Sequence, residues 1–137
     1  MKNLTEIISV LSNLFVQMED AAKLQFNLSD LTYNQMHYIE TINSIGNPNI
    51  TELALALKLT KPTVKVAVDK LIEKEYIFKV QSDEDRRSAH LHLTEKGKLI
   101  NQMHDFAHKR IAEVLSKKLT TEELNEFILL LNKVIPD

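Results

Sequence analysis

Residues 49–74 read NITELALALKLTKPTVKVAVDKLIEK, and residues 76–93 read YIFKVQSDEDRRSAHLHL. In the first stretch, apolar residues recur every three or four positions, which predicts two short helices joined by a tight turn at 58–60. Thr60 is a suitable N-cap for the second helix, and Pro62 lies in the first turn, where its missing N–H loses no hydrogen bond. The stretch therefore predicts a helix-turn-helix.

The second stretch changes from the helical period to a period of two. Residues 76–80 have the composition of a strand, and residues 82–85 have that of a turn. From 88 to 93, polar and apolar side chains alternate, as they do in a half-exposed strand. Together these segments predict one β-hairpin directly after the helix-turn-helix, which is the place of a wing.

Four further helices are predicted outside these stretches. Apolar spacing of three and four residues gives an amphipathic helix over 4–25, and capping boxes begin two more, over 32–46 and 120–135. A long helix follows the hairpin over roughly 94–117. Only two glycines and three prolines interrupt the chain, which favours a mainly α protein.

Composition excludes several classes of protein. The length of 137 residues suits one domain with one core, and a hydrophobic content of 44% excludes a disordered chain. No apolar run approaches the roughly 20 residues of a membrane span, and no signal-peptide cleavage site follows the first residues. The absence of cysteine excludes disulfides and thiolate metal sites and favours a cytoplasmic location. No phosphate loop, nucleophile elbow or dinucleotide-binding pattern is present, so we expect no enzyme.

Charge is unevenly distributed along the chain. The net charge of −2 argues weakly against a nucleic-acid partner. However, residues 1–57 carry two basic and six acidic side chains, whereas residues 58–87 carry eight basic and six acidic ones. Basic charge is therefore concentrated in the helix-turn-helix and the hairpin, where phosphates would be contacted.

The second helix of a helix-turn-helix enters the major groove of DNA, and a wing tip reaches the adjacent minor groove or phosphates. Val66 is suited to touch a thymine methyl group. The residues expected to contact double-stranded DNA are Thr60, Lys61, Pro62, Thr63, Lys65, Val66, Lys70, Arg86 and Arg87. An alternative stays open, in which Arg86 and Arg87 pair with the acidic residues of the turn and the winged helix binds only proteins.

The hairpin and the helix after it resemble the MarR family of winged-helix regulators. Asp85-Arg86-Arg87-Ser88, followed by LHLTEKGK at 91–98, is similar to that family's wing-to-helix signature. The resemblance implies a transcriptional regulator, and specifically a homodimeric repressor of a pseudo-palindromic operator. It also implies that Asp85 and Arg86 pair to shape the wing, which leaves Arg87 for direct contact with DNA.

The resemblance covers nearly the whole chain and gives a single domain over 1–137. We expect a winged helix-turn-helix with a two-stranded wing over 32–93, and dimerisation helices over 4–31 and 94–137. The large apolar side chains of helices 4–25 and 120–135 agree with this arrangement, because a monomer would leave them uncovered.

Two positions depart from the family pattern. Glu75 stands where members commonly have glycine, so the end of the preceding helix is expected to be shaped differently. Val66 stands near the position of an arginine that many members carry in the second helix, so the DNA sequence that is recognised is expected to differ.

Histidines suggest one class of effector. His104 and His108 are four residues apart on one predicted helix and therefore share a face. Zinc-responsive members of the family use histidines in this region, and His37 would complete a set of three imidazoles, with Glu19, Glu40 or Asp105 as a further ligand. We expect that no cofactor is required, and a zinc-responsive regulator that uses His37, His104 and His108 is one alternative.

A second resemblance competes with zinc. The segments MHYI at 36–39 and MHDFAHK at 103–109 are similar to the fatty-acid-synthesis repressor subgroup, which implies control by acyl-acyl carrier protein or a small apolar ligand. The side chains expected to line its pocket are Phe15, Met18, Met36, Ile39, Met103 and Phe106. A Met and Phe stripe at helical spacing is also the usual composition of a core, so both interpretations stay open.

Overall fold

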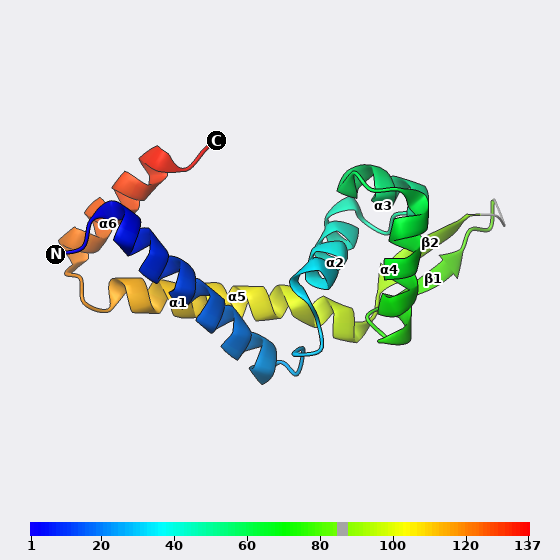
Figure 1. Ribbon diagram of the computed structural model, residues 1–137, viewed down its shortest axis with the longest axis horizontal. Coiled ribbons are helices and arrows are strands. Elements are labelled where there is room, and N and C mark those ends of the chain that lie inside the picture. Colours follow the sequence, from blue (N-terminus) through cyan, green and yellow to red (C-terminus); the bar gives the residue numbers. More distant parts are fainter. Residues whose placement is uncertain (85–87) are drawn as a thin grey trace.

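A computed structural model describes residues 1–84 and 88–137 of the chain (Figure 1). The elements follow the predicted order of four helices, a hairpin and two helices. They are α1 (Leu4–Gln25), α2 (Tyr33–Ile45), α3 (Ile50–Leu57), α4 (Lys61–Glu73), β1 (Ile77–Gln81), β2 (Ala89–Leu93), α5 (Glu95–Ser116) and α6 (Thr121–Val134).

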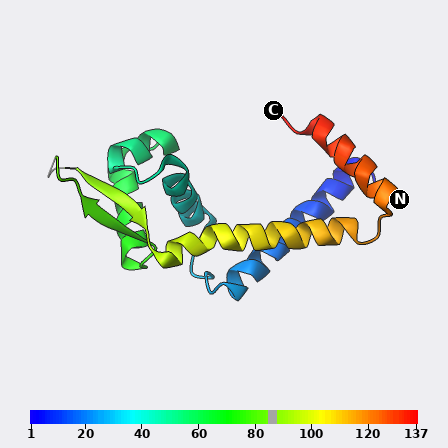
Figure 2. The ribbon, with the colours of Figure 1, turned by 180° about the vertical axis from the view of Figure 1, so that it is seen from behind.

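The molecule is elongated and has two parts. The winged-helix lobe consists of α2, α3, α4 and the hairpin, and the arm consists of α1, α5 and α6 (Figure 1). Viewed from behind, α5 runs as one continuous helix from the base of the hairpin to the far end of the arm (Figure 2). Helix α5 therefore joins the two parts.

The helices begin where the sequence predicts. Thr32 caps α2, Asn49 caps α3 and Thr120 caps α6, each in a capping box with the residue three positions on. Thr60 caps α4 by accepting a hydrogen bond from the Thr63 N–H. Side chains that satisfy the free N–H groups of the first turn thus fix these helix starts.

The end of α4 corrects one prediction. Glu75 adopts the left-handed conformation, with φ of 66°, which is the conformation that glycine at this position favours. The Tyr76 N–H donates to the Leu71 carbonyl at 3.0 Å, and the Glu75 N–H donates to the Ile72 carbonyl at 2.9 Å. This is a Schellman motif, so the helix ends in the ordinary way despite the missing glycine.

One of the two faces of the hairpin packs against the helices of the lobe. β1 and β2 pair antiparallel, with Ile77 opposite Leu93 and Lys79 opposite Leu91. On this face Ile77 and Leu91 are buried, and the Leu91 N–H donates to the Pro48 carbonyl at 2.8 Å. The alternation in the sequence therefore predicts the buried face correctly.

At the base of the hairpin, α5 begins close to the backbone. A Cβ placed on Gly97 would lie 2.3 Å from the Tyr76 carbonyl oxygen, so only glycine permits this approach. The Thr94 N–H donates to the same oxygen at 3.0 Å. These contacts hold the start of α5 against the start of β1.

Buried hydrophobic side chains lie between Ala22 and Ala107 in the described part of the chain. They join the three helices of the lobe to the hairpin and to the near half of α5. Helix α6 contributes none of them. Across residues 1–84 and 88–137, no helix combines the length and the apolar character that crossing a bilayer requires.

Candidate nucleic-acid interface

Helix α4 has two distinct faces. Val64, Val68 and Leu71 are buried against the rest of the lobe. The opposite face and the N-cap carry the predicted contact residues, all of which are exposed: Thr60, Lys61, Pro62, Thr63, Lys65, Val66 and Lys70. Val66 has 59% of its surface exposed, which leaves an apolar side chain in solvent on a helix that otherwise buries its valines.

The two threonines at the start of α4, Thr60 and Thr63, are hydrogen-bonded to each other. The Thr60 hydroxyl donates to the Thr63 hydroxyl at 2.8 Å and accepts from the Thr63 N–H at 3.4 Å. Thr60 is therefore engaged in capping the helix. Thr63, whose oxygen accepts that bond, retains its own hydroxyl proton for an external acceptor.

Two clefts flank the exposed face of α4. One, of about 320 Å³, lies between the start of α2 and α4 and is lined by Thr32, Asn34, Gln35, Tyr38, Thr63, Val66, Ala67 and Lys70. The other, of about 530 Å³, lies between α3, α4 and the hairpin and contains Lys65 and Lys79. The sequence did not reveal the α2 wall of the first cleft, because about 30 residues separate it from α4.

The hairpin extends beyond α4 at one end of the molecule (Figure 1). Lys79 on β1 pairs with Asp69 on α4, with 3.9 Å between its Nζ and the Asp69 Oδ1. Asp85 and Arg86 were predicted to shape the wing, and Arg86 and Arg87 to contact DNA. All three lie outside the described residues.

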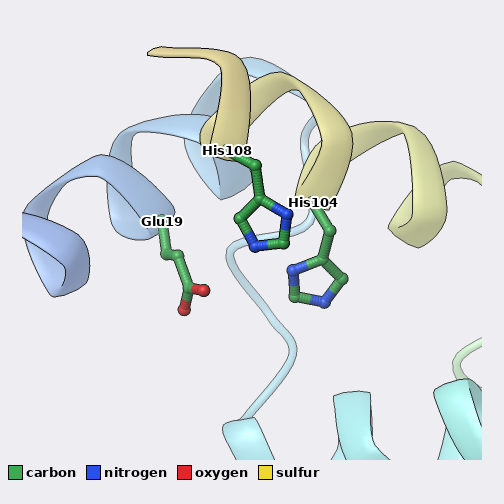
Figure 3. A group of neighbouring side chains, drawn as sticks. All are labelled: Glu19, His104 and His108. Atoms are coloured by element: carbon green, nitrogen blue, oxygen red, sulfur yellow. The ribbon is translucent and has the colours of Figure 1, made fainter. Parts of the chain in front are cut away.

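In the arm, three side chains gather between α1 and α5. Glu19, His104 and His108 each place a possible ligand atom within 4.8 Å of the others (Figure 3). The two imidazole rings are stacked, with centroids 6.0 Å apart, and His104 Nε2 also contacts the Glu40 carboxylate on α2. The predicted His37 is exposed and is not a member of this group.

Beside this group is a cavity of about 370 Å³, lined by Phe15, Glu19, His108, Ile111, Ala112 and Leu115. Of the six residues predicted to line an acyl pocket, Phe15 is the one that lines this cavity. Met36, Ile39 and Met103 are buried in the core instead. Phe106 packs edge-on against Phe26, with ring centroids 5.7 Å apart, and Met18 is half-buried on α1.

The fold and the exposed face of α4 define a winged helix-turn-helix protein. Residues 31–89 match the model of the MarR family. A DNA complex of Streptococcus pneumoniae FabT is 29% identical in sequence, with a TM-score of 0.67, over 95% of this chain and 90% of FabT. A DNA-bound variant of S. aureus MepR is 21% identical, with a TM-score of 0.78, over 97% of this chain and 96% of MepR.

Among curated relatives, the HTH-type transcriptional regulator YpoP of Bacillus subtilis is 32% identical over 73 residues, which is 53% of this chain and 52% of YpoP. The chain spans about half the length of the curated relatives that it matches. Over residues 31–89 the chain is therefore similar to the MarR family. Members of this family are transcriptional regulators rather than enzymes.

Proposed function

We propose that this chain regulates transcription by binding double-stranded DNA through α4 and the wing. The observation that carries the proposal is the exposed face of α4, on which lysines, threonines and Val66 surround two clefts. Lysines suit phosphates, whereas a hydroxyl and a small apolar side chain suit base edges. FabT and MepR, which have the same fold, were both solved with DNA.

The proposed regulator is a homodimeric repressor whose arm provides the interface. Apolar side chains on α6, including Ile128, Leu131 and Val134, are exposed in one chain. A second copy would cover them and place two α4 helices on one side of the duplex. Two symmetric copies read a pseudo-palindromic site, with half-sites about one helical turn apart.

The test begins with selection of a preferred duplex from random sequences by the wild-type protein. Binding to that duplex should weaken steeply as salt rises, and Lys65→Ala should reduce the slope against salt by about one. Lys133→Ala, on the arm, is the matched control and should leave the slope unchanged. Salt-independent binding, or no duplex enriched by selection, would instead favour a winged helix that binds proteins.

For the effector, the grouping of Glu19, His104 and His108 favours a divalent metal such as Zn²⁺. Two imidazoles and a carboxylate are a common zinc donor set, and the remaining position would be open or filled by Glu40. Since the donors come from α1 and α5, a bound ion would join two helices of the arm. This proposal uses Glu19 in place of the predicted His37.

Zinc titration followed by metal analysis of the purified protein tests this proposal. One zinc per chain, lost in His108→Ala and retained in His37→Ala, is the expected result. An apolar or acyl ligand is the competing outcome, since the cavity beside Glu19 and His108 is largely apolar. If the purified protein binds no metal, and an acyl ligand slows amide hydrogen exchange around Phe15 and Leu115, the acyl alternative would replace zinc.

A further inference from the structure

The connection between α1 and α2 is tied to the end of α4 by a set of polar contacts. The buried Tyr76 side chain, which follows α4, donates its hydroxyl hydrogen bond to Asp30 Oδ1 at 2.5 Å. Lys74 Nζ, at the C-cap of α4, donates to the Asp30 carbonyl at 2.7 Å and to Gln35 Oε1 at 3.2 Å. We call Asp30, Gln35, Lys74 and Tyr76 the latch.

The start of α5 closes the latch from the other side. Lys96 Nζ lies 4.4 Å from the centroid of the Tyr76 ring, in cation–π geometry, and 3.5 Å from the Lys74 carbonyl. Burial raises the pKa of Asp30, but the Tyr76 hydrogen bond and the charges of Lys96 and Lys74 outweigh it, so the pKa lies below its ordinary value. The carboxylate is therefore ionised when it accepts from Tyr76.

Gln35 connects the latch to the DNA-facing cleft. Its Oε1 also accepts from the Thr32 N–H at 3.1 Å in the capping box of α2. Thr32 and Gln35 line one wall of the cleft whose other wall includes Thr63 and Val66 of α4. The contacts at the C-terminal end of α4 thus fix how far its exposed face stands from the start of α2.

We propose that Asp30 and Tyr76 are positioning residues for DNA recognition, because they hold the recognition helix α4 at a fixed spacing from α2. Helix α4 has 13 residues and is about 20 Å long, so looseness at its held end becomes a larger displacement at Thr60 and Thr63. Contacts to base edges need hydrogen-bond geometry and suffer most from such displacement. Contacts to phosphates tolerate it. The inference rests on the proposed function of DNA binding.

The test compares affinity for the selected duplex with affinity for a scrambled duplex of equal length. Tyr76→Phe and Asp30→Ala should weaken binding to the selected duplex about tenfold, the equivalent of one charge-assisted hydrogen bond. Binding to the scrambled duplex should change less than about twofold, since it depends on phosphate charge. Asp30→Asn, which keeps an acceptor oxygen for the Tyr76 hydroxyl, should restore most of the preference.

A second readout requires no DNA. In Tyr76→Phe, amide hydrogen exchange should accelerate at residues 29–35 and 71–76 while the remaining lobe stays protected. Equal losses on both duplexes would overturn the positioning role, and so would an unchanged preference in both variants. If the wild type itself prefers no duplex, the proposed function fails. The exchange measurement then still decides whether the latch holds the two helices together.

Discussion

The lobe and the arm distribute apolar side chains in opposite ways. In the lobe, α2, α3 and α4 each bury apolar residues against the others, such as Ile42, Leu53 and Val68. In the arm, α6 buries none, and Ile128 and Leu131 keep 48% and 39% of their surface exposed. The hydrophobic core of the lobe closes within one chain, whereas apolar side chains of the arm stay exposed in one chain.

Helix α1 shows both behaviours along its length. Ala22, near its C-terminal end, is fully buried against the core. Leu4 and Ile8, near its N-terminal end, are 73% and 53% exposed. The boundary between buried and exposed apolar side chains therefore runs through α1. If the exposed part forms the proposed dimer interface, substitutions on either side of this boundary should have different consequences.

The largest expected effect comes from placing a charge on the exposed stripe of α6. Leu131→Asp should prevent dimerisation, because a carboxylate would be buried without a partner in the interface. Without the second recognition helix, affinity for the selected duplex should fall by about 10³-fold or more, toward nonspecific binding. Sedimentation equilibrium and fluorescence anisotropy measure the two effects.

Leu129→Asp is the matched control for that variant. Leu129 is 60% exposed and lies about 200° around the helix from Leu131, on the side of Glu122 and Glu126. It should leave the dimer intact. A dimeric Leu131→Asp protein, or dissociation by both variants, would show that the stripe is not the interface.

Substitutions in the core of the lobe should lower the free energy of unfolding rather than prevent dimerisation. Leu91 is fully buried on β2, so Leu91→Ala should destabilise the fold by about 2–5 kcal/mol in urea unfolding. Leu55→Ala, at a position 81% exposed, should change the free energy of unfolding by less than about 0.5 kcal/mol. Comparable losses of stability in Leu91→Ala and Leu55→Ala would show that Leu91 does not belong to the core.

A substitution at the end of α4 is expected to increase stability, by a smaller amount than Leu91→Ala decreases it. Glu75 holds a φ of 66°, which is strained for a residue with a Cβ. Glu75→Gly should therefore stabilise the lobe by about 1 kcal/mol. The midpoint of urea unfolding measures the gain, and a loss of stability would show that the Glu75 side chain contributes more than the backbone strain.

The smallest effect is a dependence on pH through Asp30. Its pKa lies below the ordinary 3.8, so its ionised form stabilises the fold at higher pH, and this contribution is lost as pH falls through the lowered pKa. Wild type should exceed Asp30→Asn in stability at pH 6, and the gap should narrow below pH 4. A gap that is constant with pH would exclude the carboxylate charge as its origin.

Sequence reasoning predicted the order of the elements because their signals are local. Capping residues such as Thr32, Asn49 and Thr120 mark helix starts within four residues, and the alternation over 88–93 marks the strand. The exposed face of α4 followed from its helical period. The family resemblance supplied the function expected of that face.

The parts that were missed depend on packing between distant segments. Nothing near Gln35 in the sequence indicates that it lines a cleft with Thr63, and nothing near Asp30 indicates its bond to Tyr76. Apolar spacing on a helix does not distinguish a cavity wall from the core, and Met36 and Met103, which were predicted to line an acyl pocket, are buried in the core. Glu75 shows that a departure from a family pattern need not change the backbone.

The continuity of α5 has a mechanical consequence. Its 22 residues form a rod about 33 Å long, with one end at the hairpin and the other beside α6. A rod of that length tilted by about 5° at one end moves its other end by about 3 Å, close to the 3.4 Å rise of one base pair. A slight change of angle where the arm is held would thus displace the base of the wing by about 3 Å.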